Sequence, residues 1–376
     1  MVPEGWEKTK LGKLVEINSG VAPSLLSLSD TGRYPYVKVE DMNNCNKYQT
    51  LSRTYTDDEG KKVGAGAILF PKRGAAIMNN KVRVAATDLY LDSNMMALLP
   101  NEGVSSEFLF YSLIREKLYR IADTSTIPQI NNKHINPYPF LLPPLPEQKK
   151  IAQILSTWDQ AITATERLLE NSQQRKKGLM QQLLTGKKRL PGFEGEWKKV
   201  ELGEALAYQQ PTPFLVTSTE YSDDFPTPVL TAGKSFLLGY TDETFGIYDD
   251  GLPVIIFDDF TTASQFVDFP FKAKSSAMKI LTAKPGYSIR FIFEAMRMIR
   301  FAVGGHQRHW ISIFANLVIP CPSSEEQHAI SEVCATADRE ISSLQARLDS
   351  LKSEKKALMQ QLLTGKRRVN VDTEAA

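Results

Sequence analysis

The sequence lacks the features that mark membrane, secreted and zinc-stabilised proteins. No run of 18 or more apolar residues occurs in the 376 residues, so we expect no membrane span. The opening MVPEGWEKTK contains no apolar signal region, which disfavours secretion. The three cysteines, Cys45, Cys321 and Cys334, are widely spaced and form no CxxC pair, so we expect neither a disulfide framework nor a zinc site. A cytoplasmic, reduced protein is the simplest interpretation.

A strong excess of positive charge is also missing. The net charge is +2, and it divides along the chain into +2 for residues 1–146, +5 for 147–190, −5 for 191–325, +2 for 326–369 and −2 for 370–376. A protein that binds nucleic acid without sequence preference usually carries a large basic surface. Any DNA binding by this chain must therefore depend on local clusters of charge.

The sequence does contain an internal repeat. LMQQLLTGKKR at 179–189 returns as LMQQLLTGKRR at 358–368, with ten of eleven letters the same. The match continues backward without a gap for about 45 residues, so that Glu147-Gln148 falls on Glu326-Gln327. A second match, at an offset of 191 instead of 179, places Trp6 on Trp197. The chain is therefore organised as globular, helix, globular, helix, with similar helices and divergent globular parts.

Each repeated segment predicts a long helix with a coiled-coil period. Apolar and small residues recur at alternating steps of four and three, in the same phase in both copies. The predicted core of the helix pair consists of Ile151, Leu155, Trp158, Ile162, Leu169, Leu179, Leu183, Ile330, Ile341, Leu344, Leu348, Leu351, Leu358 and Leu362. Gly186 and Gly365 stand where C′ glycines end helices. Helices of equal length and phase favour mutual, antiparallel pairing, each about 57 Å long at 1.5 Å per residue.

The two globular parts each predict an α+β unit, with strands before a helix. The first contains YPYVKVEDM, GAILFPKRGA, KVRVAATDLYL and NMMALLP as strand-like runs, followed by the helical SSEFLFYSLIREKLYRIA at 105–122. The second repeats that order and ends in the helical IRFIFEAMRMIRFAV. The predicted fold class is α+β, with two globular domains separated by two long antiparallel coiled-coil helices in a pseudo-two-fold internal repeat.

The layout and motifs resemble a known family. Two variable domains alternate with two nearly identical helices, and the first helix carries LPPLPEQKKIAQIL and LMQQLLTGKKRLPGF. This arrangement resembles the specificity (S) subunit of Type I restriction–modification enzymes over essentially the whole chain. The second copy departs at its start, where IPCPSSEEQHAISEV lacks the Leu-Pro-Pro-Leu run.

The resemblance implies a division of labour. It implies target recognition domains at 1–146 and 191–325, conserved helices at 147–190 and 326–369, and a disordered tail at 370–376. Each domain would recognise one half of a bipartite, asymmetric site in double-stranded DNA. The helices would set the spacer and dock two methylation (M) subunits for adenine N6 methylation.

The resemblance also implies that this chain is not an enzyme and binds no cofactor. S-adenosylmethionine would belong to the M subunits, and ATP and Mg to restriction (R) subunits that join the complex. The location would be cytoplasmic, in a bacterium or archaeon, and nucleoid-associated when the complex is bound to DNA, with no membrane partner.

Polar and basic clusters in each half are the candidate DNA contacts. Lys and Arg can bind phosphates or guanine, and Asn and Gln can pair with adenine. In the first half the candidates are Lys72, Arg73, Asn79, Asn80, Lys81, Arg83, Gln129, Asn131, Asn132 and Lys133. In the second half they are Lys234, Lys272, Lys274, His306, Gln307, Arg308 and His309. Asp258 and Asp259 could accept from cytosine or serve the structure, and a structural role is slightly favoured.

Catalytic alternatives find little support. TAGKS at 231–235 resembles the end of a phosphate loop, but Pro228 occupies the position that requires glycine. A nuclease using Asp258 and Asp259 would have no counterpart in the first half, where ILFPKRG stands. No methylase signature is present, because Tyr138 interrupts the double proline in INPYPF. The main alternative is a coiled-coil scaffold that carries two protein-binding domains.

Overall fold

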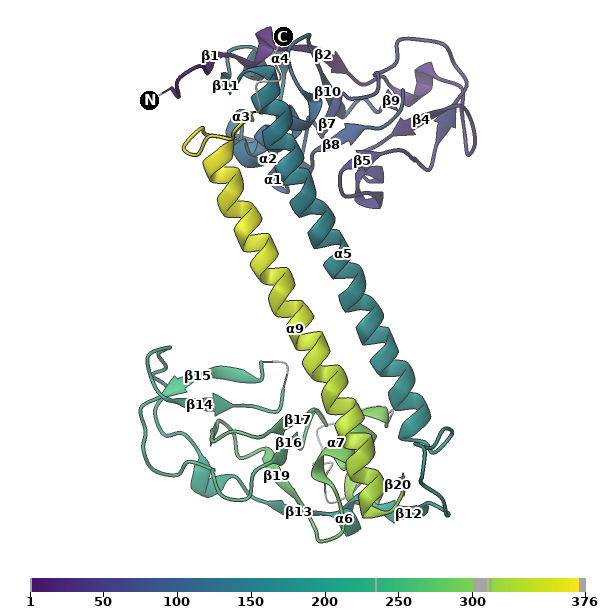
Figure 1. Cartoon of the computed structure of the whole chain (residues 1–376), viewed down its shortest axis with the longest axis vertical. Coiled ribbons are helices and arrows are strands. Elements are labelled where there is room, and N and C mark those ends of the chain that lie inside the picture. The colour runs from purple at the N-terminus through teal and green to yellow at the C-terminus, as the bar shows by residue number, and fades with distance from the viewer. Residues whose placement is uncertain (1, 234, 300–309, 311–312, 372–376) are drawn as a thin grey trace. The chain divides into compact units, whose positions relative to one another are not determined.

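The structure is a computed structural model that describes residues 2–233, 235–299, 310 and 313–371. The chain divides into two compact units. Unit 1 comprises Met1–Thr165 and Arg347–Ala376, and unit 2 comprises Glu166–Ala346. Each unit therefore contains one globular half together with a part of each long helix (Figure 1).

Unit 1 is built on short sheets with buried central strands. Strands β1 (Glu7–Lys10) and β11 (Pro139–Leu142) form an antiparallel pair. A five-stranded sheet has the order β2 (Val15–Ser19), β10 (Met95–Pro100), β7 (Ile68–Pro71), β8 (Arg83–Ala85) and β5 (Tyr48–Gln49). A four-stranded sheet has the order β3 (Leu28–Ser29), β6 (Tyr55–Thr56), β4 (Tyr34–Val37) and β9 (Tyr90–Leu91). Every residue of β7 is buried, as expected for a strand covered on both faces.

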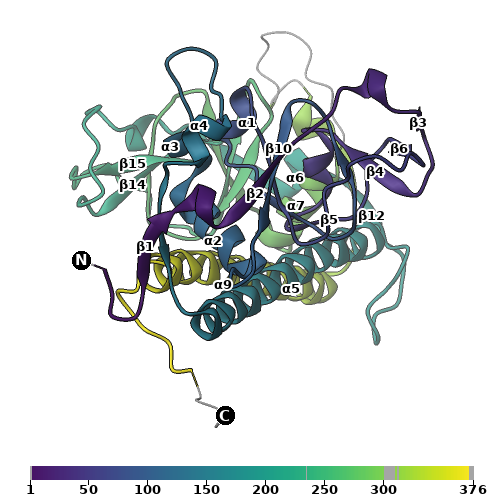
Figure 2. The ribbon, with the colours of Figure 1, turned by 90° about the horizontal axis from the view of Figure 1, so that it is seen from above.

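The described part of unit 1 also contains four short helices. They are α1 (Ala75–Met78), α2 (Ser106–Glu116), α3 (Leu118–Ile121) and α4 (Asn132–Ile135), with 3-10 turns at Leu11–Lys13, Pro23–Leu25 and Asp41–Asn44. The prediction of one helical stretch over 105–122 is wrong at Lys117, whose φ of 66° breaks it into α2 and α3. Figure 2 shows α2 between strands β2 and β10 and the helix α5.

Unit 2 resembles unit 1 in its main sheets. Strands β12 (Lys198–Glu201) and β20 (Val318–Cys321) pair as β1 and β11 do. A four-stranded sheet has the order β13 (Leu206–Gln209), β19 (Met278–Ala283), β16 (Val254–Asp258) and β17 (Ser264–Val267). A three-stranded sheet has the order β15 (Leu237–Thr241), β14 (Thr227–Leu230) and β18 (Lys272–Ala273). The remaining elements are α6 (Leu202–Ala205), α7 (Ile289–Met298), and 3-10 turns at Thr212–Phe214 and Phe314–Asn316.

The long helices have equal lengths, as the repeat predicts. Helix α5 spans Leu145–Leu183 and α9 spans Ser324–Leu362, each of 39 residues. Gly186 and Gly365 follow them with φ of 70° and 68°, the left-handed conformation expected of C′ glycines. The chain contains no described helix that is both long enough and apolar enough to cross a membrane.

Within each unit, the parts of α5 and α9 run in opposite directions. In unit 1, Asp159 of α5 pairs with Lys355, whereas Glu147, earlier in α5, pairs with Arg368, later in the chain. In unit 2 the same order holds, because Lys176 pairs with Asp338 and Arg189 pairs with Glu326. Pairs whose numbers rise on one helix while they fall on the other define an antiparallel arrangement in each unit.

The helices are also part of each unit's hydrophobic core. In unit 1, Ile151 and Leu155 of α5 pack in one cluster with Met359 of α9 and Leu109 of α2. In unit 2, Met180 and Leu183 of α5 share a cluster with Ile330 of α9. Each globular half is therefore attached to the helices by continuous apolar packing, and not by a flexible linker.

Candidate nucleic-acid interface and the joints that hold it

The structure brings the two predicted polar clusters of the first half together. The backbone N–H of Gly74 donates to the carbonyl oxygen of Pro128 at 2.9 Å, and the N–H of Ile130 donates to Lys72 at 2.9 Å. Arg73 and Gln129 thereby form an antiparallel bridge. Two loops that are more than 50 residues apart in sequence form one surface, because the end of β7 and the segment before α4 are paired.

Several predicted residues on this surface are accessible. Arg73, Asn79, Asn132 and Lys133 are exposed, and Lys72 and Gln129 are partly exposed. Among the described residues, none of Lys72, Arg73 and Lys133 has an acidic side chain in ion-pair contact. Unpaired cations beside amide side chains form a surface suited to phosphates and base edges. The exposed apolar side chains of Met78, at the end of α1, and of Ile127, in the segment before α4, lie in the same two segments and were not predicted.

Other predicted residues of the first half have internal roles. Asn80 adopts a φ of 50°; its Nδ2 donates to the carbonyl oxygen of Ile114 at 3.0 Å, and its Oδ1 accepts from the N–H of Leu118 at 2.8 Å. Arg83 donates to the carbonyl oxygen of Met42 at 2.7 Å. These contacts lie within the fold, so we do not carry Asn80 or Arg83 into the interface.

Two further candidates are engaged but remain near the surface. The Lys81 ammonium donates to Oδ1 of Asn43 at 2.7 Å, and both groups are solvent-accessible. Asn131 and His134 form a reciprocal capping box at the start of α4. The capping box orients the exposed Asn132 and Lys133 that follow Asn131.

In the second half, Lys272 is not available to DNA. Its side chain is fully buried, its Nζ lies 2.6 Å from Oε2 of Glu243, and it donates to the carbonyl oxygen of Phe245 at 2.7 Å. Burial opposes ionisation of Glu243, but hydrogen bonds from Lys272 and from Thr217 outweigh it and lower the pKa of Glu243 to about 2. This internal ion pair removes Lys272 from the candidate interface.

Asp258 and Asp259 also serve the structure. Oδ1 of Asp258 accepts from the N–H groups of Phe260 and Thr261 at 2.9 and 2.7 Å. Asp259 is buried, accepts from the N–H of Trp310 at 2.9 Å and lies 3.3 Å from Nζ of Lys279. Both oxygens of Asp259 are engaged inside the fold, so its carboxylate is not available to cytosine or a metal ion, whereas the bonds to Asp258 involve Oδ1.

Of the other predictions in this half, Lys274 donates to the hydroxyl of Tyr221 at 2.9 Å. Lys234, His306, Gln307, Arg308 and His309 lie outside the described residues. The TAGKS segment connects β14 to the strand β15, and not to the helix that a phosphate loop requires.

A polar joint fixes each globular half to the helix ends, and it is the same in both units. In unit 1, Glu147 accepts from Nε1 of Trp6 at 3.0 Å and forms two hydrogen bonds with Arg368, at 2.8 and 2.9 Å. In unit 2, Glu326 accepts from Nε1 of Trp197 at 3.2 Å, and Arg189 reaches both its oxygens at 2.6 Å. Bidentate arginine–carboxylate pairs of this kind are both strong and directional.

The glutamine that follows each glutamate completes the joint. Oε1 of Gln148 accepts from the N–H of Ser105 at 2.8 Å, and its Nε2 donates to Pro143 at 2.8 Å. Gln327 makes the same bonds to Ser288, at 2.8 Å, and to Pro322, at 3.0 Å. Because Ser105 and Ser288 cap α2 and α7, each glutamine connects a long helix to the capped end of a short one. The repeated Glu-Gln pair was the sequence signal for this joint.

A second polar cluster lies farther along the helices and differs between the units. In unit 1 the hydroxyl of Tyr111 donates to Asp159 at 2.6 Å, and Asp159 also pairs with Lys355. Burial first, and then the bond to Asp159, raises the pKa of Tyr111 well above its ordinary range, so the hydroxyl stays a donor. In unit 2, Asp338 pairs with Lys176 and with Arg290 of α7. The Asp–Lys pair is common to both units, whereas its partners on the globular half are not.

The predicted helix-pair residues divide into two groups. The buried group consists of Ile151, Leu155, Leu169, Leu183, Ile330, Leu348 and Leu362. Partly buried are Trp158, Ile162, Leu179, Ile341, Leu344, Leu351 and Leu358. The heptad phase missed Met180, Leu184, Met359 and Leu363, which are also buried. These form a second stripe that packs into the hydrophobic clusters of the two units.

Comparisons with known proteins give a consistent picture. Residues 3–171 match the family described as Type I restriction modification DNA specificity domain. The chain is 48% identical over 147 residues to the EcoR124I/EcoR124II specificity subunit of Escherichia coli, a match that spans 37% of this chain and 36% of that relative. It is 23% identical to the MjaVIII specificity subunit of Methanocaldococcus jannaschii, over 98% of this chain and 94% of that one.

A solved structure shares the fold. The S subunit of the Type I restriction-modification system from M. genitalium superposes with a TM-score of 0.68 at 15% identity. The superposition covers 96% of this chain and 99% of that chain.

Proposed function

We propose that this chain is a specificity subunit of a Type I restriction–modification enzyme and that it directs such a complex to a bipartite, asymmetric DNA site. The match of residues 3–171 to the DNA specificity domain and the similarity to specificity subunits support this proposal. In this proposal each globular half recognises one half-site. The observation that carries it is the contrast between the two units. The Trp–Glu–Arg joints are the same in both, whereas the exposed loops differ.

The first half would contact DNA through two paired segments, residues 72–80 after β7 and residues 127–133, which lead into α4. Arg73 and Lys133 would bind phosphates or guanine, and Asn79, Gln129 and Asn132 would contact base edges. Within unit 1 these loops are held by the backbone bonds between Lys72, Gly74, Pro128 and Ile130. A surface fixed by backbone bonds loses less entropy when it binds than a mobile one does.

The two long helices would form an antiparallel coiled coil that sets the spacer between the half-sites and docks two methylation subunits. A joint at each globular half is what such a spacer requires, because a loose attachment would let the spacing vary. The Glu147 and Glu326 pairs supply this attachment. The pseudo-two-fold arrangement would present one methylation subunit to each DNA strand.

Catalysis would belong to the other subunits. Methyl transfer to adenine N6 from S-adenosylmethionine would occur in the methylation subunits, and ATP with Mg would serve the restriction subunits. The described residues of this chain contain no group of three or more His, Cys, Asp or Glu side chains placed to hold a metal ion.

The test is to express the chain with its methylation subunits in a host that lacks N6-methyladenine and to sequence the host genome for that base. We expect one split motif with a methylated adenine on each strand. Absence of motif-specific methylation, or both marks on one strand, would contradict the proposal.

The main alternative is a protein-binding scaffold, and DNA with varied spacers separates the two. We expect the complex to lose affinity when the spacer between half-sites is changed by one base pair. A scaffold for protein partners would bind all spacers equally. DNA binding that ignores the spacer would remove the proposed role of the helices while leaving the family assignment intact.

A further inference from the structure

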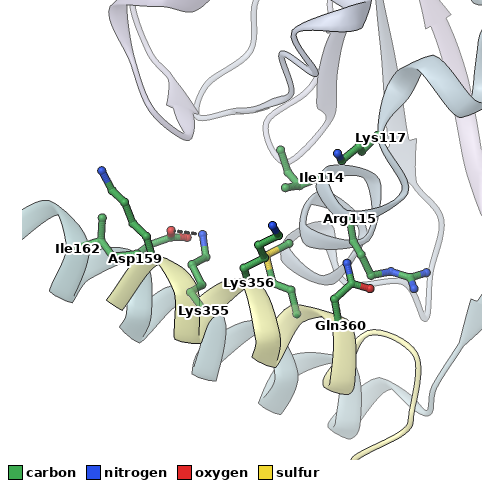
Figure 3. A pocket seen from close by; sticks show the side chains of 10 residues that line it. Ile114, Arg115, Lys117, Asp159, Ile162, Lys355, Lys356 and Gln360 are labelled. Carbon is green, nitrogen blue, oxygen red and sulfur yellow. Dashed lines mark hydrogen bonds and ion pairs between the residues drawn. The ribbon is translucent and has the colours of Figure 1, made fainter. Parts of the chain in front are cut away.

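Unit 1 contains a groove between the end of α2 and the two long helices (Figure 3). The groove has a volume of about 380 Å³ and an apolar floor that includes Ile162 and Met359. Cationic side chains surround this floor. Figure 3 shows Lys356 reaching from α9 toward Ile114 on α2, beside the ion pair of Asp159 with Lys355.

Unit 2 contains the same groove, with a volume of about 490 Å³. The helix positions that line it are those of unit 1 shifted by the offset of 179 that relates the two helices, with Gln173 in place of Lys352. Ile341 and Met180 form the floor, Asp338 pairs with Lys176, and Lys177 takes the place of Lys356. The end of α7 closes this groove as the end of α2 closes the first.

The grooves carry a net positive charge, and some of their cationic side chains have no ion-pair partner among the described residues. In unit 1 the lining holds five cationic side chains and only one carboxylate, that of Asp159. That carboxylate is already paired with Lys355. Across the part of the chain that the structure describes, neither Lys356 nor its counterpart Lys177 has an ion-pair partner, and both are exposed. Each groove therefore offers a free ammonium group beside an apolar floor.

We propose that both grooves bind the same segment of a partner protein, an acidic segment that inserts an apolar side chain between carboxylates. The apolar side chain would cover Ile162 and Met359, and its flanking carboxylates would pair with Lys356 in unit 1 and Lys177 in unit 2. Because the groove occurs once in each unit, two copies of the same partner would fill both grooves.

DNA is a weaker candidate for the occupant. A phosphate backbone gains nothing from an apolar floor, and an apolar surface buried against it would leave polar groups unsatisfied. The loops proposed to contact DNA also differ in sequence between the units, whereas six of the seven groove positions on the long helices carry the same residue in both units. Two grooves with nearly the same lining favour one kind of partner protein that binds twice, once in each groove.

This inference rests on the proposed function, which supplies a partner in two copies, the methylation subunit. It goes beyond that proposal by naming the contact surface and the chemistry of the segment that fills it. A photo-crosslinking amino acid placed at Lys356 or Lys177 of the full chain, with purified methylation subunit and target DNA as probes, tests it directly. We expect both positions to crosslink to one acidic segment of the methylation subunit.

A charge-reversal pair provides the second measurement. The double substitution Lys177→Glu and Lys356→Glu should weaken binding of the methylation subunit at least about tenfold, because each groove then repels carboxylates. The matched control is Lys187→Glu with Lys366→Glu, which changes the same charges at exposed, repeat-related positions outside the grooves. The control pair should leave affinity within about twofold, since rim charges distant from a contact contribute little.

The outcomes separate the two proposals. Crosslinks to DNA, to a segment without acidic residues, or to different segments from the two positions would overturn the inference. So would a groove double variant that binds as tightly as the control pair. If the wild-type chain and the methylation subunit form no complex, the proposed function itself fails and the inference fails with it.

Discussion

Arg368 and Glu147 lie 221 residues apart and form a two-point ion pair, with Nε to Oε1 at 2.8 Å and Nη2 to Oε2 at 2.9 Å. Glu147 is nearly buried, and it also accepts from the indole of Trp6. The pair therefore joins the chain's first residues, the start of α5 and the segment after α9 in a single contact. Its repeat-related copy, Arg189 with Glu326, does the same in unit 2.

Substitution of Glu147 by glutamine should loosen this joint. We expect a loss of about 1–2 kcal/mol in the stability of unit 1, because the charge that Arg368 binds is removed while Arg368 keeps access to water. Hydrogen–deuterium exchange should accelerate at residues 3–10 and 363–371. The Glu332→Gln variant, at an exposed position of α9, is the control and should leave exchange unchanged. Unchanged protection in Glu147→Gln would show that the joint adds no stability.

The glycines that end the two helices should differ in their tolerance of alanine. Both have positive φ, so a side chain costs about 1 kcal/mol in either place. A Cβ at Gly365 would also lie 2.3 Å from Cγ of Pro3, whereas a Cβ at Gly186 would meet Trp197 at 3.4 Å, an ordinary contact. We therefore expect Gly365→Ala to lower the unfolding midpoint in urea more than Gly186→Ala does. Equal midpoints would mean that the segment around Pro3 moves aside without cost.

The Glu243–Lys272 pair should make unit 2 sensitive to acid. The folded pKa of Glu243 is about 2, below its ordinary value of 4.5, so ionised Glu243 stabilises the fold above pH 4.5. That stabilisation is lost as the pH falls from 4.5 toward 2. In Glu243→Gln, stability should be lower at pH 7 and should depend less on pH across this window.

Thermal unfolding between pH 2 and pH 7, monitored by tryptophan fluorescence, measures the effect of Glu243→Gln. Glu220→Gln, at an exposed position nearby, is the matched control and should follow the wild-type curve. Parallel pH curves for Glu243→Gln and the wild type would contradict the assignment, since ionisation of Glu243 would then add nothing to the pH dependence of stability.

The long helices could be predicted from the sequence, and the surroundings of single polar side chains could not. The repeat and the heptad period predict α5 and α9 to within two or three residues, because helical periodicity is a local property. Lys272 looked like a surface lysine because its partner, Glu243, is 29 positions away and only the folded sheet brings them together. Asn80 looked like a base-reading amide for the same reason, since its partners lie on α2 and α3.

The second apolar stripe of the helices shows a related limit. A heptad search selects the face that one helix turns toward another. Met180 and Met359 lie one position beyond that face and pack into the globular halves, which a helix-only pattern does not include. The two joints could have been predicted from the internal repeat, because Trp6 aligns with Trp197 and Glu147 aligns with Glu326.

The proposed DNA surface of unit 1 predicts two kinds of mutant. Arg73→Ala or Lys133→Ala should weaken DNA binding by the assembled complex. If the lost side chain contacts a phosphate, the slope of log affinity against log salt concentration should also become shallower by about 1 for each side chain. Asn79→Ala should cost about 1–3 kcal/mol if Asn79 contacts a base edge, and should relax sequence preference in one half-site only. The other half-site should keep its preference, because unit 2 is unaltered.

Fluorescence anisotropy of the complex on labelled target DNA, repeated at several salt concentrations, distinguishes these roles. A uniform loss across sequences, with a shallower salt slope, identifies a phosphate contact, whereas a loss confined to the cognate half-site identifies base recognition. Lys61→Ala is the matched control, because Lys61 is exposed in unit 1 and pairs with Glu16 away from these loops. If Arg73→Ala, Lys133→Ala and Asn79→Ala all bind like Lys61→Ala, the paired loops do not face DNA, and recognition by unit 1 must come from another surface.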